Sequence, residues 1–591
     1  MGRHAGSIVV AAGLAMAVWA PGCASAAHYV VDQASPVAAD DNPGTAESPL
    51  KTIQRAAELV RPGDTVRVMA GSYEGRVTFA EGRSGAEGKP IAFVAMPRHA
   101  VTMQGFDTSH CDHLRIEGFV ITPAKSDSRT DSIGIRVASS HVEVLDNVFV
   151  KNGWVPISGR SYAADGFTKA TDVHVAFNKI HQSSFGLYIS GRRWLVERNE
   201  VTRMQSLMPG ADCDYTRTFG VGHVVRDNRF HGSTRKEIGK SHIDGLQYYN
   251  VNDDYAANIR YERNVIFDCG QSLYVSNSGK KTMKETRDWT FSENIISHTP
   301  GSDLTGSKAV SCVYVPKTSA TYNTIFGQGY FGVAIHHCPD SVIVGNICSQ
   351  LSSYGYGGQD LSGLTNDYNL LHEAGKPRVE SPGEHDLIDV DPMFVDAAKR
   401  NFRLTKGSPA IGAGSGGRTL GALAWPNVYY VDSRHPGADD EGFGYPGWPF
   451  RTVKAALAMA QPGETIELRG GTYRECIRPQ VDGVTLRAAK GEAVIVTGAD
   501  LVSDWQRGGD GWSAPLADAP ARVLRDGEPW DGVQYDAAAK RIRVTDFDPR
   551  LHVFETVVRR HAVDLSGAKN VTVERLRAVH TLGEAVVETG D

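Results

Sequence analysis

"RNEV" at residues 198–201 belongs to a short motif, an Asn followed by an apolar pair or near-pair, that recurs through the middle of the chain. Most copies follow an alternating apolar stretch such as "HVEVLD". The shortest spacings are 21 residues (178 to 199) and 23 residues (323 to 346). The asparagines of this motif are Asn147, Asn178, Asn199, Asn228, Asn264, Asn294, Asn323, Asn346 and Asn369.

A period in the low twenties that is built of short strands is typical of a solenoid. Leucine-rich repeats share this period, but the chain lacks their leucine spacing and their helical half. Asn suits tight turns because it tolerates left-handed geometry, and stacked Asn side chains can hydrogen-bond to one another along an axis. The motif therefore predicts an all-β fold, a right-handed parallel β-helix.

The start of this solenoid occurs twice. "PLKTIQRAAELVRPGDTVRVMAGSY" (49–73) matches "PFRTVKAALAMAQPGETIELRGGTY" (449–473), and each copy has helical spacing followed by a strand. We predict a first β-helix with a cap helix over 27–425 and a second unit over 426–591. The second unit begins near residue 428 and carries a β insertion and few coils. It looks incomplete at its C-terminus, so either the chain is a fragment or something else covers that end.

These features resemble a known superfamily. The start module, the Asn-bearing coils and the segment "DPMFVDAAKRNFRLTKGSPAIGAG" (391–414) look like secreted β-helix proteins of the pectate-lyase-like superfamily. The last segment resembles the closing end of their helices. The resemblance implies the fold and a polysaccharide substrate or ligand.

The ends and the composition limit the remaining possibilities. Residues 1–26 read as a signal peptide with an A-x-A cleavage site at 24–26, which predicts a secreted or periplasmic protein; Cys23 leaves lipid attachment open. No later stretch is long and apolar enough to span a membrane, and a net charge of −6 gives no pull toward nucleic acid. The seven later cysteines either form disulfides or pack in the core. The oligomeric state is not determined.

Alternation along the strands predicts which side chains point outward. The aligned strands give one outward column of Arg136, Tyr188, Gln247, Tyr274, Tyr314 and Ala334. They give a second of Ala138, Ser190, Tyr249, Ser276, Pro316 and His336. Exposed aromatic rings on one face suit the flat faces of sugars, although Tyr is also simply favourable in strands. With two basic residues of the loop before it, the predicted substrate-binding set is Arg136, Tyr188, Arg235, Lys236, Gln247, Tyr274, Tyr314 and His336.

The stretch "KSHIDGLQYYN" (240–250) carries groups suited to β-elimination of a uronic-acid polymer. That reaction needs a cation for the carboxylate, a base and an acid. Lys240 or Arg235 could neutralise the carboxylate, His242 or Lys240 could be the base, and Tyr249 or Tyr188 could protonate the leaving oxygen. Asp244 could orient His242 or bind calcium, or it could bond backbone amides in an ordinary turn.

Calcium is a further expectation. "ADGFTKATDVHVAFNKI" (164–180) resembles a segment of one calcium-dependent pectate lyase family, which implies that Asp165 is a calcium ligand. The next coil, "HQSSFGLYI", lacks the aspartates that this family has there. A glycoside hydrolase stays an alternative, although the clustered Asp motifs and Gly-His-Gly of β-helix hydrolases are missing. A non-catalytic glycan-binding or adhesin-like protein is the other alternative to a polysaccharide lyase.

Overall fold

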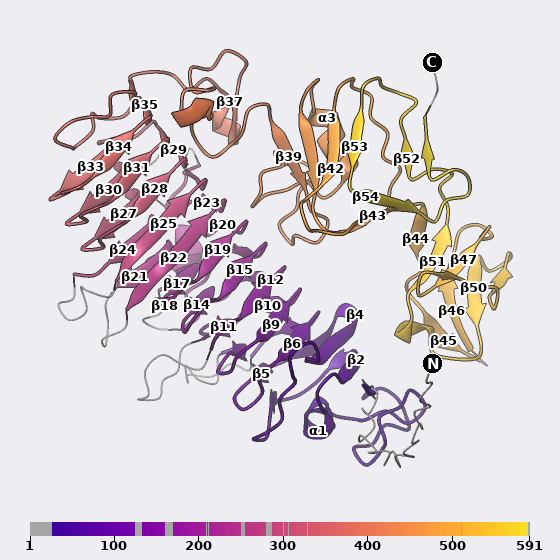
Figure 1. Cartoon of the computed structure of the whole chain (residues 1–591). Helices are drawn as coiled ribbons and strands as arrows, with labels where there is room; N and C mark the ends of the chain where they lie inside the picture. Colours follow the sequence, from indigo (N-terminus) through magenta and orange to yellow (C-terminus); the bar gives the residue numbers. More distant parts are fainter. Residues whose placement is uncertain are drawn as a thin grey trace, which may run out of the picture.

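The computed structural model describes residues 26–588 apart from 124–132, 160–169, 209, 211, 250–254, 279–285, 300, 305, 328 and 510. Nearly all of the predicted signal peptide lies outside this range. The chain first forms a long stack of parallel strands and then a second, smaller stack (Figure 1). The predicted fold class, a parallel β-helix, is confirmed.

Each coil of the first β-helix contributes strands to three parallel ladders, and the apolar residues between the ladders form one continuous core. Among the described residues, the ladder that forms the outer face has 11 strands. They are β3 (Arg76–Thr78), β5 (Gly105–Asp107), β8 (Ile135–Arg136), β11 (Ile157–Ser158), β14 (Leu187–Ile189), β17 (Thr216–Thr218), β21 (Asp244–Tyr249), β24 (Gln271–Ser276), β27 (Lys308–Val313), β30 (Phe331–His336) and β33 (Tyr356–Gln359).

The other two ladders lie on either side of the asparagine turns. Strands that precede the asparagines include β9 (Val142–Leu145), β12 (His174–Ala176), β15 (Leu195–Glu197), β19 (Val224–Arg226), β22 (Ala256–Glu262), β25 (Arg287–Ser292), β28 (Ser319–Thr321), β31 (Val342–Val344) and β34 (Thr365–Asp367). Strands that follow them include β10 (Val148–Val150), β13 (Lys179–His181), β16 (Glu200–Thr202), β20 (Arg229–His231), β23 (Val265–Phe267), β26 (Ile295–Ser297), β29 (Thr324–Phe326), β32 (Ile347–Ser349) and β35 (Leu370–His372).

The asparagines form a buried ladder along the axis. The side-chain carbonyl of Asn199 accepts from the backbone N–H of Asn178 at 2.9 Å, and Asn199 donates in the same way to Asn228. The ladder ends at Asp386, which accepts from the backbone N–H of Asn369 at 2.7 Å. The left-handed residue is the one before each Asn, for example Arg198 with φ 55°. The asparagines therefore satisfy buried backbone groups, and their neighbours make the turn.

The two copies of the start module share their contacts as well as their sequence. Thr52 caps helix α1 (Ile53–Leu59), and Thr452 caps helix α3 (Val453–Met459). The hydroxyl of Tyr73 donates to the carbonyl of Val31 in the first module, and that of Tyr473 donates to the equivalent Val431 in the second. The same local chemistry therefore begins both stacks, and the domain boundary near 425 stays a prediction.

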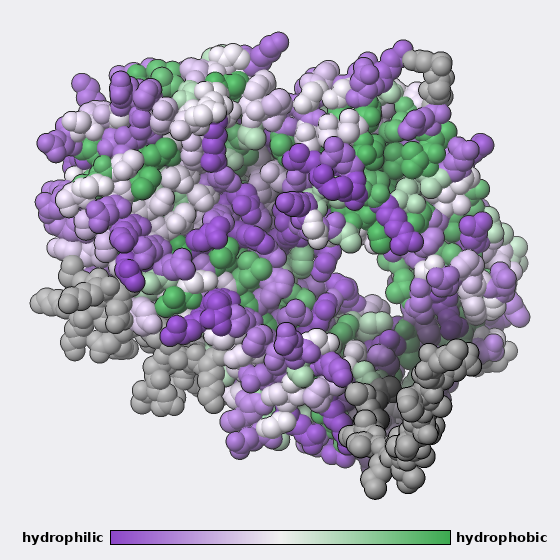
Figure 2. Space-filling view, viewed as in Figure 1, coloured by the Kyte–Doolittle hydropathy of each residue, from purple (hydrophilic) through white to green (hydrophobic). Residues whose placement is uncertain are grey.

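The second unit contains short parallel ladders and an antiparallel region between β43 (Val494–Thr497) and β53 (Thr572–Glu574). Among the described residues, ion pairs join it to the first β-helix in two regions. Arg198 pairs with Glu492 beside the asparagine ladder, and Arg550 pairs with Asp32 at the N-terminal cap. Figure 2 shows an opening between the two regions.

Two smaller expectations can be compared with the described residues. No helix among them is long and apolar enough to cross a membrane. The seven cysteines after Cys23 are free thiols, and all but Cys476 are buried. For the six buried cysteines the core-packing alternative holds rather than disulfide pairing.

Candidate active site

The strand register fixes which outward residues are neighbours on the outer face. Running along the axis, the first outward column is Arg136, Ser158, Tyr188, Arg217, Gln247, Tyr274, Ser311, Ala334 and Gly357. The predicted column lacked the coils of β11 and β17, whose strands are only two and three residues long. The alternate positions around Arg217 are Thr216 and Thr218, and the alternate position after Ile157 is Gly159, so neither stretch shows the apolar alternation that revealed the other strands.

The predicted place of Tyr314 in this column is wrong. Strand β27 ends at Val313, and Tyr314 lies in a left-handed corner with φ 56°, where its ring stacks on His337 at 4.4 Å. Ser311 takes its place. The second column runs Tyr249, Ser276, Val313 and His336, so the prediction of Pro316 is also wrong. The corner shifts the register by three residues.

Burial also reduces the number of aromatic rings that are exposed on this face. Tyr188 is only 3% exposed, because its ring stacks on Phe219 at 5.3 Å. Gln247 is buried, whereas Tyr274 is half-buried and Tyr249 is 36% exposed. The prediction that Tyr188 and Gln247 lie exposed on the surface is therefore wrong. An exposed aromatic face remains at Tyr249 and Tyr274.

Sequence reasoning missed Arg217, which lies between Tyr188 and Gln247 in the first column. Its guanidinium is buried, pairs with Asp214 at 2.8 Å and with Asp212, and donates to the hydroxyl of Tyr249 at 3.2 Å. Burial acts to lower the pKa of Arg217, but Asp214, Tyr249 and Tyr188 together outweigh it and the net pKa is raised. Arg217 therefore stays charged beside the Tyr249 hydroxyl. The sequence signal available was "DCDYTR" at 212–217, in which two aspartates precede an arginine.

Two buried carboxylates lie under the site. Asp214 accepts from the backbone N–H of Asp244 at 3.0 Å, and Asp244 accepts from the side chain of Gln247 at 2.9 Å and the backbone of Gln271 at 3.1 Å. Burial raises the pKa of Asp244 well above its usual value, and the neighbouring Asp214 raises it further. Burial likewise raises the pKa of Asp214. Neither carboxylate reaches the surface as a hydrolase pair would require.

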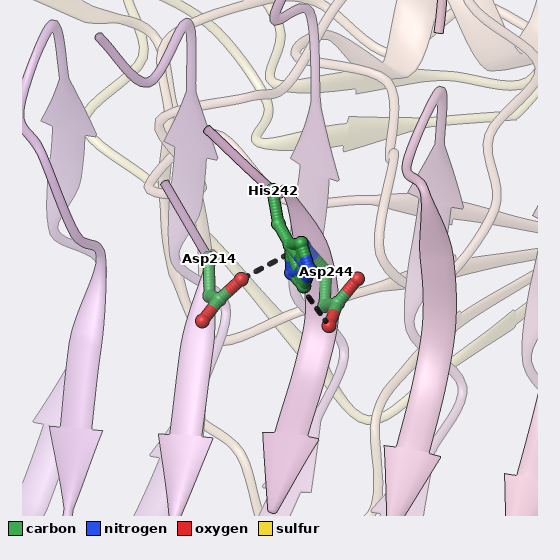
Figure 3. Close-up of side chains that lie close together, drawn as sticks. All are labelled: Asp214, His242 and Asp244. Atoms are coloured by element: carbon green, nitrogen blue, oxygen red, sulfur yellow. Dashed lines mark hydrogen bonds and ion pairs between the residues drawn. The ribbon is translucent and has the colours of Figure 1, made fainter. Parts of the chain in front are cut away.

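His242 lies over these carboxylates. Its side chain is 48% exposed, and its Nδ1 lies 3.6 Å from Oδ2 of Asp244. Figure 3 shows the imidazole between Asp214 and Asp244. Lys240, exposed in the same turn, completes the predicted catalytic stretch. The structure thus brings His242 and Asp244 together, and Arg217 links this coil to Tyr249.

The loop before this turn carries Arg235 and Lys236, which were predicted to bind substrate, but Arg235 is bonded within its own loop. A capping box between Thr234 and Glu237 caps the N-terminus of helix α2 (Arg235–Ile238). The guanidinium of Arg235 donates to the carbonyls of Gly239 and Ser241, so Arg235 holds its own loop together. Lys236 is exposed. At the other end of the column, Arg136 faces Asp107 at 3.5 Å.

Asp214, His242 and Asp244 could also be considered as a metal site, because their ligand atoms lie within 4.8 Å of one another. Calcium prefers six to eight oxygen ligands. Here one ligand is an imidazole, and both carboxylates already accept hydrogen bonds from Arg217, Gln247 and backbone amides. The cluster therefore does not fit calcium. The predicted ligand Asp165 lies outside the described residues, so calcium at that position stays a prediction.

Beyond Tyr274, basic and aromatic side chains continue along the face. The ammonium of Lys308 lies over the ring of Tyr274 at 5.5 Å, and the guanidinium of Arg378 lies over Tyr354 at 4.8 Å. Burial lowers the pKa of His336, and the charges of Lys308, His337 and Arg378 lower it further. These cations therefore act on one shared patch around His336.

Comparison with known proteins adds the following. No protein-family model matches the chain. A segment of 128 residues is 30% identical to the uncharacterized protein YwoF of Bacillus subtilis (strain 168), covering 19% of this chain and 27% of that protein. The chain thus spans about a quarter of the length of this curated relative.

Similar solved structures include enzymes and an adhesin. The PL6 family alginate lyase AlyGC is 15% identical with a TM-score of 0.39, over 75% of this chain and 67% of that one. Pectate lyase Pel9A is 14% identical with a TM-score of 0.40, over 68% and 97%. The Streptococcus pneumoniae surface protein and adhesin PfbA is 12% identical with a TM-score of 0.37, over 60% and 98%. At this level of similarity none of them assigns an activity to the chain.

Proposed function

We propose that the first β-helix cleaves an acidic polysaccharide by β-elimination, with His242 as the base. The observation that carries the proposal is the exposed imidazole of His242, set over the buried carboxylate of Asp244 at 3.6 Å, on the face that holds the Arg217–Tyr249 pair. An exposed base, a supporting carboxylate and a hydroxyl held by a cation are the parts that such an elimination needs.

His242 would take the proton from the carbon next to the uronate carboxylate. When Asp244 is ionised it can accept from Nδ1–H, which leaves Nε2 of His242 unprotonated. The Nδ1 to Oδ2 distance of 3.6 Å is longer than a hydrogen bond, and such contacts often tighten only when substrate binds. Asp244 would thereby act as a positioning residue.

Tyr249 would supply the acid. As the bond from carbon to the leaving oxygen breaks and the new carbon–carbon double bond forms, the Tyr249 hydroxyl would give its proton to that oxygen. Arg217 donates to this hydroxyl at 3.2 Å, so its positive charge would stabilise the phenolate that results. Lys240, two residues before His242, would neutralise the substrate carboxylate.

Acidic polysaccharides of this class occur outside the cytoplasm. Because residues 1–26 read as a signal peptide, we also propose a secreted or periplasmic location. Isolating the mature protein from the growth medium or periplasm, with a new N-terminus near residue 27, would support this location. Recovery of the full-length chain from the cytoplasm alone would contradict it.

The proposed chemistry is tested with a panel of uronic-acid polymers that includes polygalacturonate and alginate, followed by the ultraviolet absorbance of unsaturated ends. We expect cleavage of at least one polymer, its loss in His242→Ala, and its retention in the control variant His28→Ala, which changes an exposed His at the first strand. Absence of unsaturated ends with every polymer would contradict the lyase proposal. Glycan binding without cleavage would then favour the adhesin-like alternative.

A further inference from the structure

The first outward column becomes smaller toward the C-terminal end of the outer face. After Tyr274 it continues with Ser311, Ala334 and Gly357. Ser311 and Ala334 are each 1% exposed. At Gly357 φ is 124°, and a Cβ would lie 2.3 Å from the carbonyl oxygen of Arg378, so no larger residue fits. These three residues form a low floor on the sheet.

One edge of this floor is lined by larger basic and aromatic side chains. Lys308 and Phe331 are register partners in neighbouring strands, and Phe331 packs on Tyr354 at 4.5 Å. The guanidinium of Arg378, an exposed residue, lies over the ring of Tyr354. Tyr330, next to Phe331, is 58% exposed. This edge therefore presents two cations and exposed aromatic surface.

The opposite edge is lined by Val313, His336 and Gln359, which are register partners in the same three strands. A cavity of about 610 Å³ continues past the last coil and is lined in part by Gly358, Asn366 and Arg378. The small column, its two edges and this cavity together define a trough, which begins beyond Tyr274 and ends at Arg378.

The charge of the trough favours anions. Lys308 and Arg378 both act on His336, which lies on the far edge. Two acidic residues, Asp360 and Glu380, line the cavity at its end together with Arg378, and Asp360 pairs with His337. Lys308 and Arg378 lie three coil steps apart, which is about 14 Å at about 4.8 Å per step. That separation suits charges that repeat along an extended polymer.

We infer that an acidic glycan lies along this trough, running from the His242 coil toward the C-terminal end of the first β-helix, with Lys308 and Arg378 pairing with separate carboxylates of one chain. The inference rests on the proposed function, because it takes the ligand to be a uronic-acid polymer. It adds a direction and a binding subsite distant from the reacting groups. Aromatic surface at Tyr330 and Phe331 would pack on the sugar faces between the two ion pairs.

The test measures binding without cleavage. Hexasaccharides of galacturonate and of alginate are titrated by calorimetry into His242→Ala and into the same protein with Lys308→Ala and Arg378→Ala added. We expect a roughly tenfold or greater loss of affinity in the double variant for the hexasaccharide that binds, with a weaker salt dependence. Lys308→Arg with Arg378→Lys should retain most of the affinity, because both charges remain. Lys399→Ala, which removes an exposed cation elsewhere, should have no effect.

Equal affinity of the double-alanine variant and its His242→Ala parent would overturn the inference, as would absence of binding by that parent. If polymers are cleaved but the double variant binds normally, the subsite is wrong and the proposed function stands. If no polymer is cleaved but the two cations control binding, the subsite is correct and the lyase proposal fails. Thermal unfolding of each variant shows whether a loss of binding comes from loss of the fold.

Discussion

Nη1 of Arg217 donates to the hydroxyl of Tyr249 at 3.2 Å, although the two residues are 32 positions apart in the chain. The contact joins β17 to β21 on the outer face. It places a buried, permanently charged group against the hydroxyl of the exposed tyrosine of β21, whereas the neighbouring Tyr248 on the same strand is buried in the core.

Arg217→Lys should lower kcat roughly 100-fold, because a lysine cannot contact Asp214 and Tyr249 together as the guanidinium does. Lysine keeps the positive charge, so the buried Asp214 retains a cationic partner and the fold should survive. Unsaturated-end formation gives kcat, and circular dichroism checks the fold. Arg260→Lys, at an exposed arginine on a different ladder, is the matched control. An unchanged kcat in a folded Arg217→Lys protein would remove Arg217 from the mechanism.

Asp244 should make stability fall as pH rises. Burial raises its pKa in the folded protein, so between the unfolded pKa of about 3.9 and this raised value the folded state holds a proton that the unfolded chain has released. Stability therefore decreases with pH across that window. Asp244→Asn has no such carboxyl, so its stability lacks this pH-dependent decrease. The free energy of unfolding of the variant, relative to that of the parent, should therefore increase as pH rises above about 4.

Urea unfolding at a series of pH values measures this difference. Asp268→Asn serves as the control, because Asp268 is a carboxyl on a neighbouring corner that pairs with Thr299. A constant difference between Asp244→Asn and the parent over the whole range would show that Asp244 does not titrate as predicted.

The same carboxyl should shape the pH dependence of activity. Ionised Asp244 is a much stronger acceptor for Nδ1–H of His242 than the protonated acid, so kcat/KM should rise as pH passes the raised pKa of the Asp214–Asp244 pair. Asp244→Asn should lose most of the activity, and the kcat/KM of this variant should not show that rise with pH. A parent profile that is flat from the ordinary carboxyl range upward would contradict the positioning role.

The asparagine ladder should carry much of the stability of the first β-helix. Asn228→Ala leaves the backbone N–H of Asn199 and the carbonyl of Val196 without their partner, which should cost about 1–3 kcal/mol for each buried group. Gln506→Ala, an exposed amide in the second unit, should change stability little. Chemical denaturation measures both. Equal effects of the two substitutions would show that the ladder contributes no more than a surface amide.

Charge reversal at the Arg198–Glu492 ion pair should separate the two units beside the asparagine ladder. Arg198→Glu places a carboxylate against Glu492 and Asp432 and should expand the molecule in small-angle scattering. Adding Glu492→Arg restores an opposite-sign pair and should return the compact form. If the single variant scatters like the parent, the other contacts hold the second unit in place without this pair.

Only part of the candidate site could be predicted from the sequence. His242, Asp244 and Tyr249 were found because they lie within one short stretch, where local order is enough. Arg217 was missed because it contacts that stretch from the previous coil, through a strand of three residues that gives no alternation. Tyr188 and Tyr314 were misplaced because exposure depends on a neighbouring ring in one case and on a left-handed corner in the other.

The sequence alone determined the β-helix, because each asparagine marks the same position in a coil and successive coils must stack to satisfy its side chain. It also determined that the start module occurs twice. Only the tertiary structure decided which outward residues are neighbours. Loops of different length separate the strands, so spacing along the chain does not give the register, and a shift of a few residues replaces Tyr314 by Ser311. The Arg217–Tyr249 contact and the trough beyond Tyr274 both follow from that register.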